Sequence, residues 1–405
     1  MSRNNFITAI DIGTENTKIL VVEKTIEGED LKVVYFVKEK TFGVRKGIII
    51  SPEDVSEILQ KCLLEIDEKI GQKIESACVS VNGSHLFSLS SRGTIAVSRA
   101  DKKISEDDMQ RALQAAKTFS LSSNREIIEA SPKNFIIDGE QIVKDPLGLD
   151  GVRLEAETLV LGGFSPYLKN VTQSVLGSGL HISDMIPCPV ADARALLTPR
   201  QKELGVAVLD IGAGATGLAI YEEGSLVHLS VLPVGSNNIT NDIAIGLTID
   251  ADVAEKIKKE YGSCSSTASK KIKVEIGESE ALTFSHKALS KIISARVSEI
   301  FREVQKELKK VALVQNLPAG IVITGGGAKI PRILELAKKE FKLPCKLGKP
   351  SGFIGLDEDP SLSTVCGLAL LEADMTDGEN SSCPENEVIK NLWFRIKKML
   401  KALIP

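Results

Sequence analysis

The sequence lacks the features of a disulfide-stabilised protein, a zinc protein or a bilayer-spanning protein. Its 7 cysteines are irregularly spaced and never form a C-x-x-C pair, which favours reduced thiols in a reducing cytosol. The 4 histidines are scattered, so we expect no Cys/His metal site. We expect no signal peptide, because residues 1–5 lead directly into a strand-like run, and no apolar run reaches the roughly 18 residues that span a bilayer.

Charge and length narrow the class further. The formal net charge of -4 excludes a surface-wide basic field of the kind that recruits nucleic acid. A chain of 405 residues exceeds what one hydrophobic core usually serves, so two or more subdomains are expected.

The most informative feature is a segment that occurs twice, at residues 9–23 (AIDIGTENTKILVVE) and 208–222 (VLDIGAGATGLAIYE). Each copy predicts a β-hairpin, because an apolar strand ends in Asp-Ile-Gly, turns through small residues and continues as a second strand. Gly13 and Gly212 can adopt positive φ, which would turn backbone N–H groups towards an anion. Two facing hairpins would clamp a polyphosphate, with Asp11 and Asp210 holding a hydrated Mg²⁺. The alternative is two ordinary hairpins with solvated tips.

Two other glycine patterns need separate interpretation. Residues 212–217 spell G-x-G-x-x-G, but a strand-like run follows where a dinucleotide-binding fold needs a helix. Gly325, Gly326 and Gly327 follow a predicted strand at 321–324, and Pro331 is predicted to begin a helix over 332–341. Glycines at that turn would let a flat base and ribose lie on the backbone. No Walker A sequence occurs, so a P-loop nucleotidase is not indicated.

The end of the sequence predicts a surface helix after a flexible linker. Residues 374–386 are polar and acidic, with Gly, Ser and Pro, and the helix predicted over 387–403 has an apolar stripe with basic flanks. This pattern favours a helix that lies in a membrane interface. The alternatives are that the helix docks on the chain's own core or in the groove of a partner protein. The candidate membrane-contacting residues are Ile389, Leu392, Trp393, Ile396, Leu400, Lys397 and Lys398.

Together, the three glycine signatures resemble the phosphate-1, phosphate-2 and adenosine motifs of the actin, Hsp70 and sugar-kinase superfamily. Within it, the chain resembles the bacterial cell-division family FtsA over nearly its whole length. The stretches that carry the resemblance are 43–48 (GVRKGI), 79–85 (VSVNGSH), 135–138 (FIID), 145–148 (DPLG) and 324–331 (TGGGAKIP).

The resemblance implies an α/β actin-like ATPase fold of two lobes with duplicated ribonuclease-H-like cores. Subdomain 1A would comprise 1–82, 164–197 and 351–373, with an inserted 1C (SHS2-type) subdomain at 83–163. Subdomain 2A would comprise 198–240 and 315–350, and subdomain 2B would span 241–314. The linker at 374–386 and the amphipathic membrane-targeting helix at 387–405 would follow.

The resemblance also implies an ATP and Mg²⁺ site, residue by residue. Asp11 and Asp210 would position the metal and water. The nucleotide would be held by Gly13, Thr14, Glu15, Asn16, Lys18, Gly212, Ala213, Gly214, Ala215, Gly235, Glu255, Lys258, Gly325, Gly326 and Lys329. Lys259 could also contact the nucleotide, together with Glu255 and Lys258. The alternative for all three residues is a solvated helix face without a role in binding.

One departure from the superfamily concerns hydrolysis. The connecting stretch 187–193 has no carboxylate where the Hsp70 pattern places its water-orienting glutamate. Asp192 lies a few residues after the expected position. It could supply the missing carboxylate, or it could be a residue on the helix surface. We therefore expect firm nucleotide binding with slow or weak ATPase activity at most.

By resemblance, the protein anchors filaments of the tubulin-like FtsZ to the cytoplasmic face of the cell membrane at the division site. It would bind the FtsZ carboxyl-terminal tail, polymerise with itself through 1C and 2B contacts under nucleotide control, and meet other divisome proteins, but no nucleic acid. Arg302, Lys306 and Lys309 would face the acidic tail, with a solvated face as the alternative. The rival functions are a PilM-type pilus-assembly adaptor and a small-molecule kinase of the same superfamily.

Overall fold

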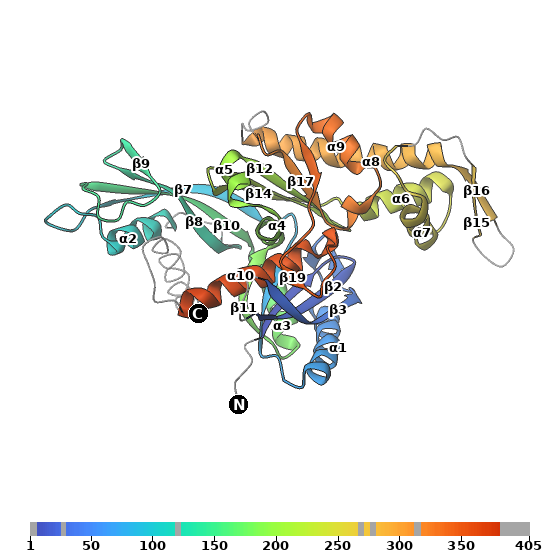
Figure 1. The fold of residues 1–405 in the computed structure, drawn as a ribbon, viewed down its shortest axis with the longest axis horizontal. Helices are drawn as coiled ribbons and strands as arrows, with labels where there is room; N and C mark the ends of the chain where they lie inside the picture. The colour runs from blue at the N-terminus through green and yellow to red at the C-terminus, as the bar shows by residue number, and fades with distance from the viewer. Residues whose placement is uncertain are drawn as a thin grey trace.

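A computed structural model of the chain describes residues 6–25, 30–117, 123–265, 271–275, 281–311 and 317–380. Its centre consists of two sheets of the same topology (Figure 1). The first has the order β11-β6-β1-β2-β3-β19, and the second has the order β14-β13-β12-β17-β18. The strands of the first sheet are β1 (Ile7–Ile12), β2 (Asn16–Lys24), β3 (Leu31–Lys40), β6 (Ser76–Val81), β11 (His181–Pro187) and β19 (Phe353–Ile354).

The second sheet repeats five of the six strands of the first, and β19 has no counterpart. Its members are β12 (Val206–Ile211), β13 (Thr216–Glu222), β14 (Ser225–Leu232), β17 (Ile321–Thr324) and β18 (Cys345–Leu347). In both sheets the first strand pairs antiparallel with the second and parallel with the strand on its other side. Five strands therefore correspond in order and direction, which confirms the predicted duplicated core.

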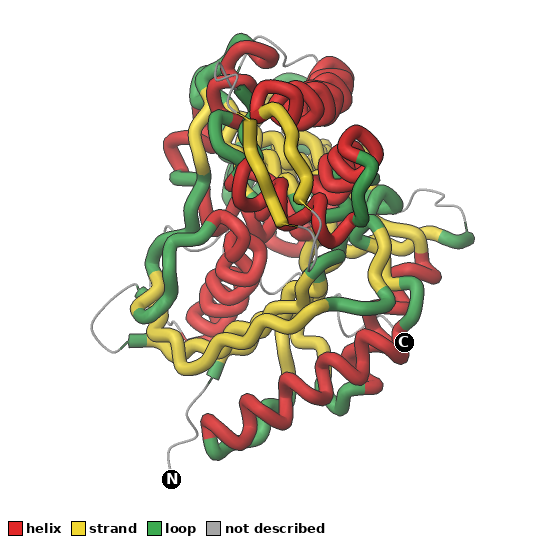
Figure 2. The backbone as a smooth tube through the Cα atoms, turned by 90° about the vertical axis from the view of Figure 1, so that its right-hand side faces the viewer, coloured by secondary structure: helices red, strands yellow, loops and turns green. Residues whose placement is uncertain are grey.

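The central strands of each sheet are buried on both faces because helices pack against the sheets (Figure 2). Every residue of β1 and β12 is buried, as expected for uninterrupted apolar runs in sheets of this kind. On the first sheet, α1 (Pro52–Ile70) and α3 (Ser165–Gly177) cover one face, and α4 (Cys188–Leu196) and α10 (Ser363–Asn380) cover the other. The second sheet packs against α4 and α5 (Pro199–Leu204) on one side and against α6 (Ser236–Leu247), α8 (His286–Lys310) and α9 (Ile333–Phe341) on the other.

Two smaller units extend from the central sheets at opposite ends of the molecule (Figure 1). One is an antiparallel sheet of order β7-β10-β8-β9 with α2 on one face, formed by β7 (Phe87–Ala96), α2 (Glu106–Lys117), β8 (Arg125–Ile137), β9 (Gln141–Val143) and β10 (Arg153–Phe164). The other is formed by α6, α7 (Ala251–Tyr261), the start of α8 and the hairpin of β15 (Lys271–Glu275) and β16 (Ala281–Ser285). The short pair β4 (Val44–Arg45) and β5 (Ile48–Ile49) follows β3.

Two predicted boundaries differ from the structure. Helix α10 continues to Asn380, so 374–380 is helical rather than linker, and the Arg194 guanidinium holds Asp374 there at 2.7 Å. Helix α9 begins at Ile333 and not at Pro331, because Arg332 before it has a φ of 64° and the Pro331 carbonyl accepts a hydrogen bond from the backbone N–H of Cys264.

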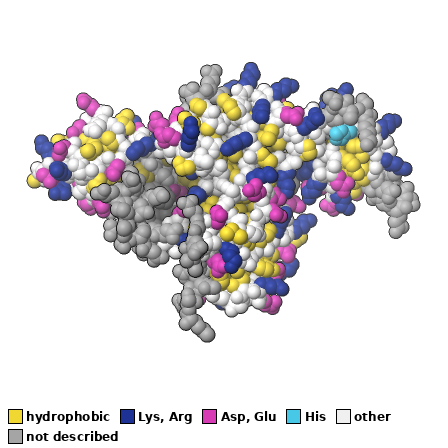
Figure 3. All heavy atoms as spheres, viewed as in Figure 1, with side chains coloured by type: hydrophobic (Ala, Val, Ile, Leu, Met, Phe, Trp, Pro, Cys, Tyr) yellow, Lys and Arg dark blue, Asp and Glu magenta, His cyan; other side chains and the backbone are white. Residues whose placement is uncertain are grey.

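Within the described ranges, every helix is too short or too polar to span a membrane. On the face in Figure 3, acidic and basic side chains are interspersed. The predicted amphipathic helix at 387–405 and all its candidate membrane-contacting residues lie outside the described residues.

Candidate functional site

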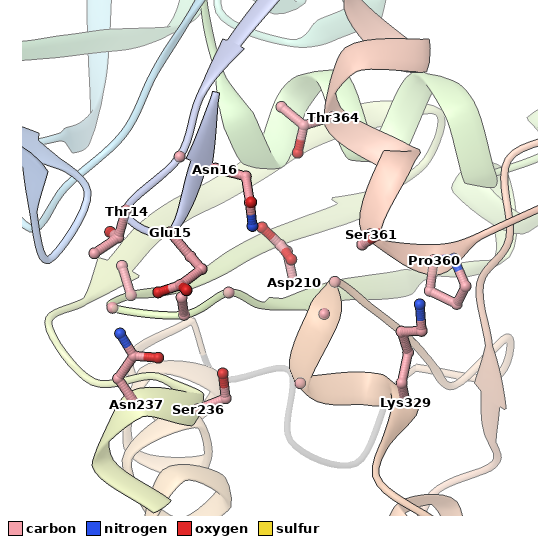
Figure 4. A pocket seen from close by; sticks show the side chains of 18 of the residues that line it. Thr14, Glu15, Asn16, Asp210, Ser236, Asn237, Lys329, Pro360, Ser361 and Thr364 are labelled. Atoms are coloured by element: carbon pink, nitrogen blue, oxygen red, sulfur yellow. The ribbon is translucent and has the colours of Figure 1, made fainter. Parts of the chain in front are cut away.

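A cleft of about 510 Å³ lies where the turns of the two matched hairpins meet (Figure 4). It is lined from the first sheet by the β1–β2 turn, from the second sheet by the β12–β13 turn and the triple glycine, and from further along the chain by the starts of α6 and α10. The cleft therefore brings together segments that are hundreds of residues apart in the sequence.

The two hairpin turns are closed by equivalent backbone hydrogen bonds. The N–H of Gly13 donates to the Asn16 carbonyl at 3.1 Å, and the N–H of Gly212 donates to the Ala215 carbonyl at 3.0 Å. Neither glycine has positive φ, so that part of the prediction is wrong. They are required for close approach instead, because a Cβ at Gly13 or Gly212 would lie 2.8 or 2.9 Å from the carbonyl oxygen that closes its own turn.

The tips of the two hairpins touch across the cleft. A Cβ on Gly214 would lie 2.8 Å from the side chain of Thr14 and 3.1 Å from the Cα of Lys46. The Thr14 hydroxyl in turn accepts a hydrogen bond from the N–H of Gly47 at 2.9 Å. Only a residue without a side chain lets the second turn come this close to the first.

Asp11 and Lys18 form a buried ion pair beneath the first turn. The Lys18 ammonium lies 2.7 Å from the Asp11 carboxylate, whose other oxygen accepts a hydrogen bond from Ser80 at 3.2 Å. Burial alone would lower the pKa of Lys18, but the charge of Asp11 raises it above its ordinary value. Lys18 is therefore a charged side chain held against Asp11 at the base of the cleft.

Two further carboxyl groups lie near the Asp11–Lys18 pair: Asp210 lines the cleft, and Asp192 is buried in the protein interior close to Asp210. Burial and the charge of Asp11 raise the pKa of Asp210 to about 7. Asp192 is fully buried rather than on the helix surface; it accepts a hydrogen bond from the Thr364 hydroxyl at 2.8 Å. Burial and the charge of Asp210 raise the pKa of Asp192 well above its ordinary value. Among the described residues, no group of three or more His, Cys, Asp or Glu is placed to bind a metal ion directly.

The triple-glycine turn forms one side of the cleft. Gly325 has a φ of +86°, and a Cβ there would lie 2.0 Å from the Asp210 carboxylate. At Gly326, which lines the cleft, an added Cβ would meet nothing within 4 Å. Beside this turn the Lys329 ammonium lies 2.6 Å from Asp359. Burial would raise the pKa of Asp359, but hydrogen bonds from Lys329 and Ser361 lower it to about 2.

Glu255 and Lys258 of α7 form the side of the cleft that faces α6. The Lys258 side chain is 7% exposed, and its ammonium lies 2.6 Å from Glu255, 2.8 Å from the Thr240 hydroxyl and 3.2 Å from the Ser236 carbonyl. Lys259 lies 3.2 Å from the other oxygen of Glu255. Burial would raise the pKa of Glu255, but these partners hold it below its ordinary value.

Nearly all of the predicted nucleotide-contacting residues line this one cleft. Gly235 does not; a Cβ there would lie 2.5 Å from the Ala213 carbonyl, so this glycine supports the second turn from behind. Arg302, Lys306 and Lys309 are exposed on α8 and lie outside the cleft. The lining residues that were not predicted include Lys38, Asn82, Ser236, Asn237, Pro360, Ser361 and Thr364.

For two of these residues, Ser236 and Asn237, the sequence contains a pattern from which they could have been predicted. They open α6 directly after the Gly235 turn, and their N–H groups donate to the carbonyls of Gly212 and Ala213 at 2.9 and 2.8 Å. A predicted helix start next to a phosphate-like turn would have marked them.

Comparison with known proteins adds the following findings. The family model for the cell division protein FtsA matches residues 207–367, and the model for the SHS2 domain inserted in FtsA matches residues 83–161. The chain is 34% identical to the cell division protein FtsA of Pseudomonas aeruginosa over an alignment of 371 residues. This alignment covers 90% of this chain and 88% of that protein.

Solved structures of the same fold are more distant in sequence. A chain of the PilM-PilN type IV pilus biogenesis complex matches with a TM-score of 0.64 at 16% identity, over 90% of this chain and 98% of that chain. MreB5 of Spiroplasma citri bound to ADP matches with a TM-score of 0.58 at 14% identity, over 93% of this chain and 99% of that chain. At these identities the likeness concerns the fold alone, and it confirms the predicted actin-like ATPase fold.

Proposed function

The chain belongs to the FtsA family of cell division proteins, and from this premise we propose that it binds ATP with Mg²⁺ and anchors FtsZ filaments to the cytoplasmic face of the cell membrane. In this role it helps to assemble the division septum and polymerises with itself under nucleotide control. Family membership favours this function over the small-molecule kinase. It also favours it over the PilM-type adaptor, whose likeness at 16% identity concerns the fold alone.

The observation that carries the proposal is the pair of hairpin turns in contact through Gly214 and Thr14. Turns of this kind, one from each sheet, can hold a polyphosphate from both sides. The residues fit a nucleotide, because the open space over Gly326 suits a flat base or ribose and the start of α6 lies beside the second turn. The solved MreB5 structure with ADP supports a nucleotide in this fold.

Asp11 and Asp210 occupy equivalent positions at the ends of β1 and β12, and both line the cleft. They would hold Mg²⁺ through water, since this ion retains water and accepts few carboxylates. When bound, the metal would neutralise charge on the phosphates. Asp192 is turned to Thr364 in the protein interior, so it does not supply the missing carboxylate of the connecting stretch. We therefore propose slow or weak ATP hydrolysis at most.

The positions of the two small units support self-assembly. The unit formed by β7 to β10 corresponds to the proposed 1C subdomain at 83–163, and the unit around α7 and the β15–β16 hairpin corresponds to the proposed 2B subdomain at 241–314. They lie at opposite ends of the long axis in Figure 1, so one molecule's 1C could meet the next molecule's 2B. Such a head-to-tail contact repeats along a filament.

On α8, Arg302, Lys306 and Lys309 follow helical spacing and are exposed, which suits an acidic FtsZ tail. Lys306 also lies 2.7 Å from Glu303, an exposed ion pair that an incoming carboxylate can replace at little cost.

The nucleotide part is tested by titrating the full chain with a fluorescent ATP analogue, with Mg²⁺ or with EDTA. Saturable binding that competes with unlabelled ATP and weakens in EDTA is expected. Absence of any adenine-nucleotide binding would sink the proposal.

The anchoring part is tested by co-sedimentation with anionic liposomes, comparing the full chain with a chain ending at Asn380. That end point keeps all of α10, so loss of sedimentation is attributable to 381–405. A labelled FtsZ-tail peptide should bind the wild type and bind more weakly to the double variant Arg302→Glu, Lys306→Glu. Equal binding by both chains would rule out this face of α8.

A further inference from the structure

Lys38 is a second lysine of the first sheet that lines the cleft. It belongs to β3 and stands directly opposite Lys18 in the β2–β3 ladder. Both side chains line the cleft, so they lie on the same face of the sheet. Like charges directly opposite each other in a ladder destabilise it, so this pair carries an unfavourable interaction unless an anion compensates it.

The two lysines differ in their partners. Lys18 is held 2.7 Å from Asp11, which compensates part of its charge. Lys38 is exposed and forms no ion pair within the part of the chain that the structure describes. Its positive charge is therefore available to a ligand.

The other charged groups that face Lys38 come from three further segments. Partial burial and the charge of Lys18 lower the pKa of Lys38, Lys329 and Lys259 act in the same direction, and Asp359 opposes them. Asp359 is itself held by Lys329 at 2.6 Å, which reduces its effect on the surroundings. Of the four charges that act on Lys38, three are positive and one is negative, so an anion beside Lys38 would be favoured.

We propose that Lys38 contacts the phosphate chain of the bound nucleotide and makes the affinity depend on the number of phosphates. The inference rests on the proposed nucleotide binding and names a residue that selects the triphosphate. A nucleoside triphosphate carries one more negative charge than the diphosphate, so a lysine that acts through charge favours the triphosphate. Adenosine has no phosphate and gains nothing from Lys38.

The test measures the affinities of ATP, ADP and adenosine by isothermal titration calorimetry, each with Mg²⁺. The variants are Lys38→Met and Lys38→Arg, and the matched control is Lys32→Met. Lys32 lies on the same strand, is exposed, pairs with Glu23 at 2.6 Å and does not line the cleft. Thermal unfolding of each chain without nucleotide is measured in parallel.

For Lys38→Met we expect a roughly fivefold loss of ATP affinity, corresponding to a partly exposed ion pair of about 1 kcal/mol. The loss should be smaller for ADP and absent for adenosine, and it should shrink at high salt because exposed charges are screened. Lys38→Arg should keep most of the affinity, and Lys32→Met should bind like the wild type. The unliganded Lys38→Met chain should unfold no earlier than the wild type, because its repulsion with Lys18 is removed.

The proposal is overturned if ATP affinity is unchanged in Lys38→Met, or if ATP and adenosine lose affinity by the same factor. The second result would mean that Lys38 only shapes the cleft. If the wild-type chain binds none of the three ligands, the proposed nucleotide binding fails, and the assignment of Lys38 fails with it.

Discussion

Replacing neighbouring glycines of the triple-glycine turn should separate folding from binding. Gly326→Ala adds a methyl group that meets nothing within 4 Å, so the fold should tolerate it. Gly326 does not have a positive φ, so alanine can adopt its backbone conformation. The substitution should therefore leave the free energy of unfolding unchanged or raise it by at most about 0.4–1 kcal/mol. The same methyl group projects into the cleft where we place the adenosine, so nucleotide affinity should fall roughly tenfold, a loss of about 1.4 kcal/mol.

Gly325→Ala should have the opposite profile. Its φ of 86° and ψ of 172° lie in a region almost restricted to glycine, which costs alanine about 1–3 kcal/mol. The new Cβ would also lie 2.0 Å from the Asp210 carboxylate and 2.6 Å from the Ile211 carbonyl. Because the Ile211 backbone cannot move without disturbing β12, we expect a further cost of about 1–3 kcal/mol. The sum is a destabilisation of roughly 2–6 kcal/mol.

The control for the backbone effect is Gly179→Ala, since Gly179 has a φ of +87° with nothing within 4 Å of a Cβ. The difference between Gly325→Ala and Gly179→Ala in urea denaturation then reports mainly the clash of the new Cβ with Asp210 and Ile211. Nucleotide affinity is measured by fluorescence titration on the folded variants, with Gly326→Leu as a bulkier substitution. If Gly326→Ala and Gly326→Leu both bind ATP like the wild type, the adenosine does not lie on this turn and the reasoning is refuted.

Two buried groups give further predictions. Burial and Asp210 raise the pKa of Asp192, so the folded chain binds this proton more tightly than the unfolded chain, and the stability contributed by Asp192 falls as pH rises above its unfolded pKa of about 3.9. Asp192→Asn keeps an acceptor for Thr364 and removes the titration, so its stability relative to wild type should increase with pH in urea denaturation; a constant difference would contradict this. Glu255→Ala leaves the Lys258 ammonium buried beside neutral partners only, and because Glu255 is 27% exposed we discount the usual cost of breaking a buried pair to about 2 kcal/mol. If Glu255→Ala lowers the free energy of unfolding by less than about 0.5 kcal/mol in urea denaturation, the Glu255–Lys258 pair stabilises the fold no more than an exposed ion pair does.

The sequence predicted those parts of the site that depend on local pattern. The repeat identified both hairpins because each turn is encoded within about fifteen neighbouring residues, and strand alternation and glycine turns are local signals. The role of Gly13 and Gly212 was misjudged, because sequence shows that a glycine is present but not whether φ or close approach requires it. Their φ is not positive, and the carbonyl of the same turn occupies the space of a side chain.

Residues far along the chain could not be placed from sequence. Ser361 and Thr364 enter the cleft because α10 packs against α4 and β1, and that packing depends on long-range contacts. For the same reason Asp192 was open to a surface interpretation. Its neighbours in sequence allow an exposed helical position, whereas Thr364, 172 residues away, makes it a buried hydrogen-bond acceptor.

Helix α4 joins the two sheets through contacts of different kinds. Towards the first lobe, α4 is fixed to α10 by directional contacts: a Cβ on Gly367 would lie 1.8 Å from the Ala191 carbonyl, Thr364 donates to Asp192, and Arg194 holds Asp374 at 2.7 Å. Towards the second sheet, α4 contributes apolar packing, including Pro189 against Gly217. Apolar contacts are non-directional and tolerate sliding, whereas hydrogen-bonded and interlocked contacts do not. Helix α4 is therefore bound to the first lobe by hydrogen bonds as well as packing, whereas its contact with the second sheet depends on packing alone, and the contact between Gly214 and Thr14 joins the two hairpins directly.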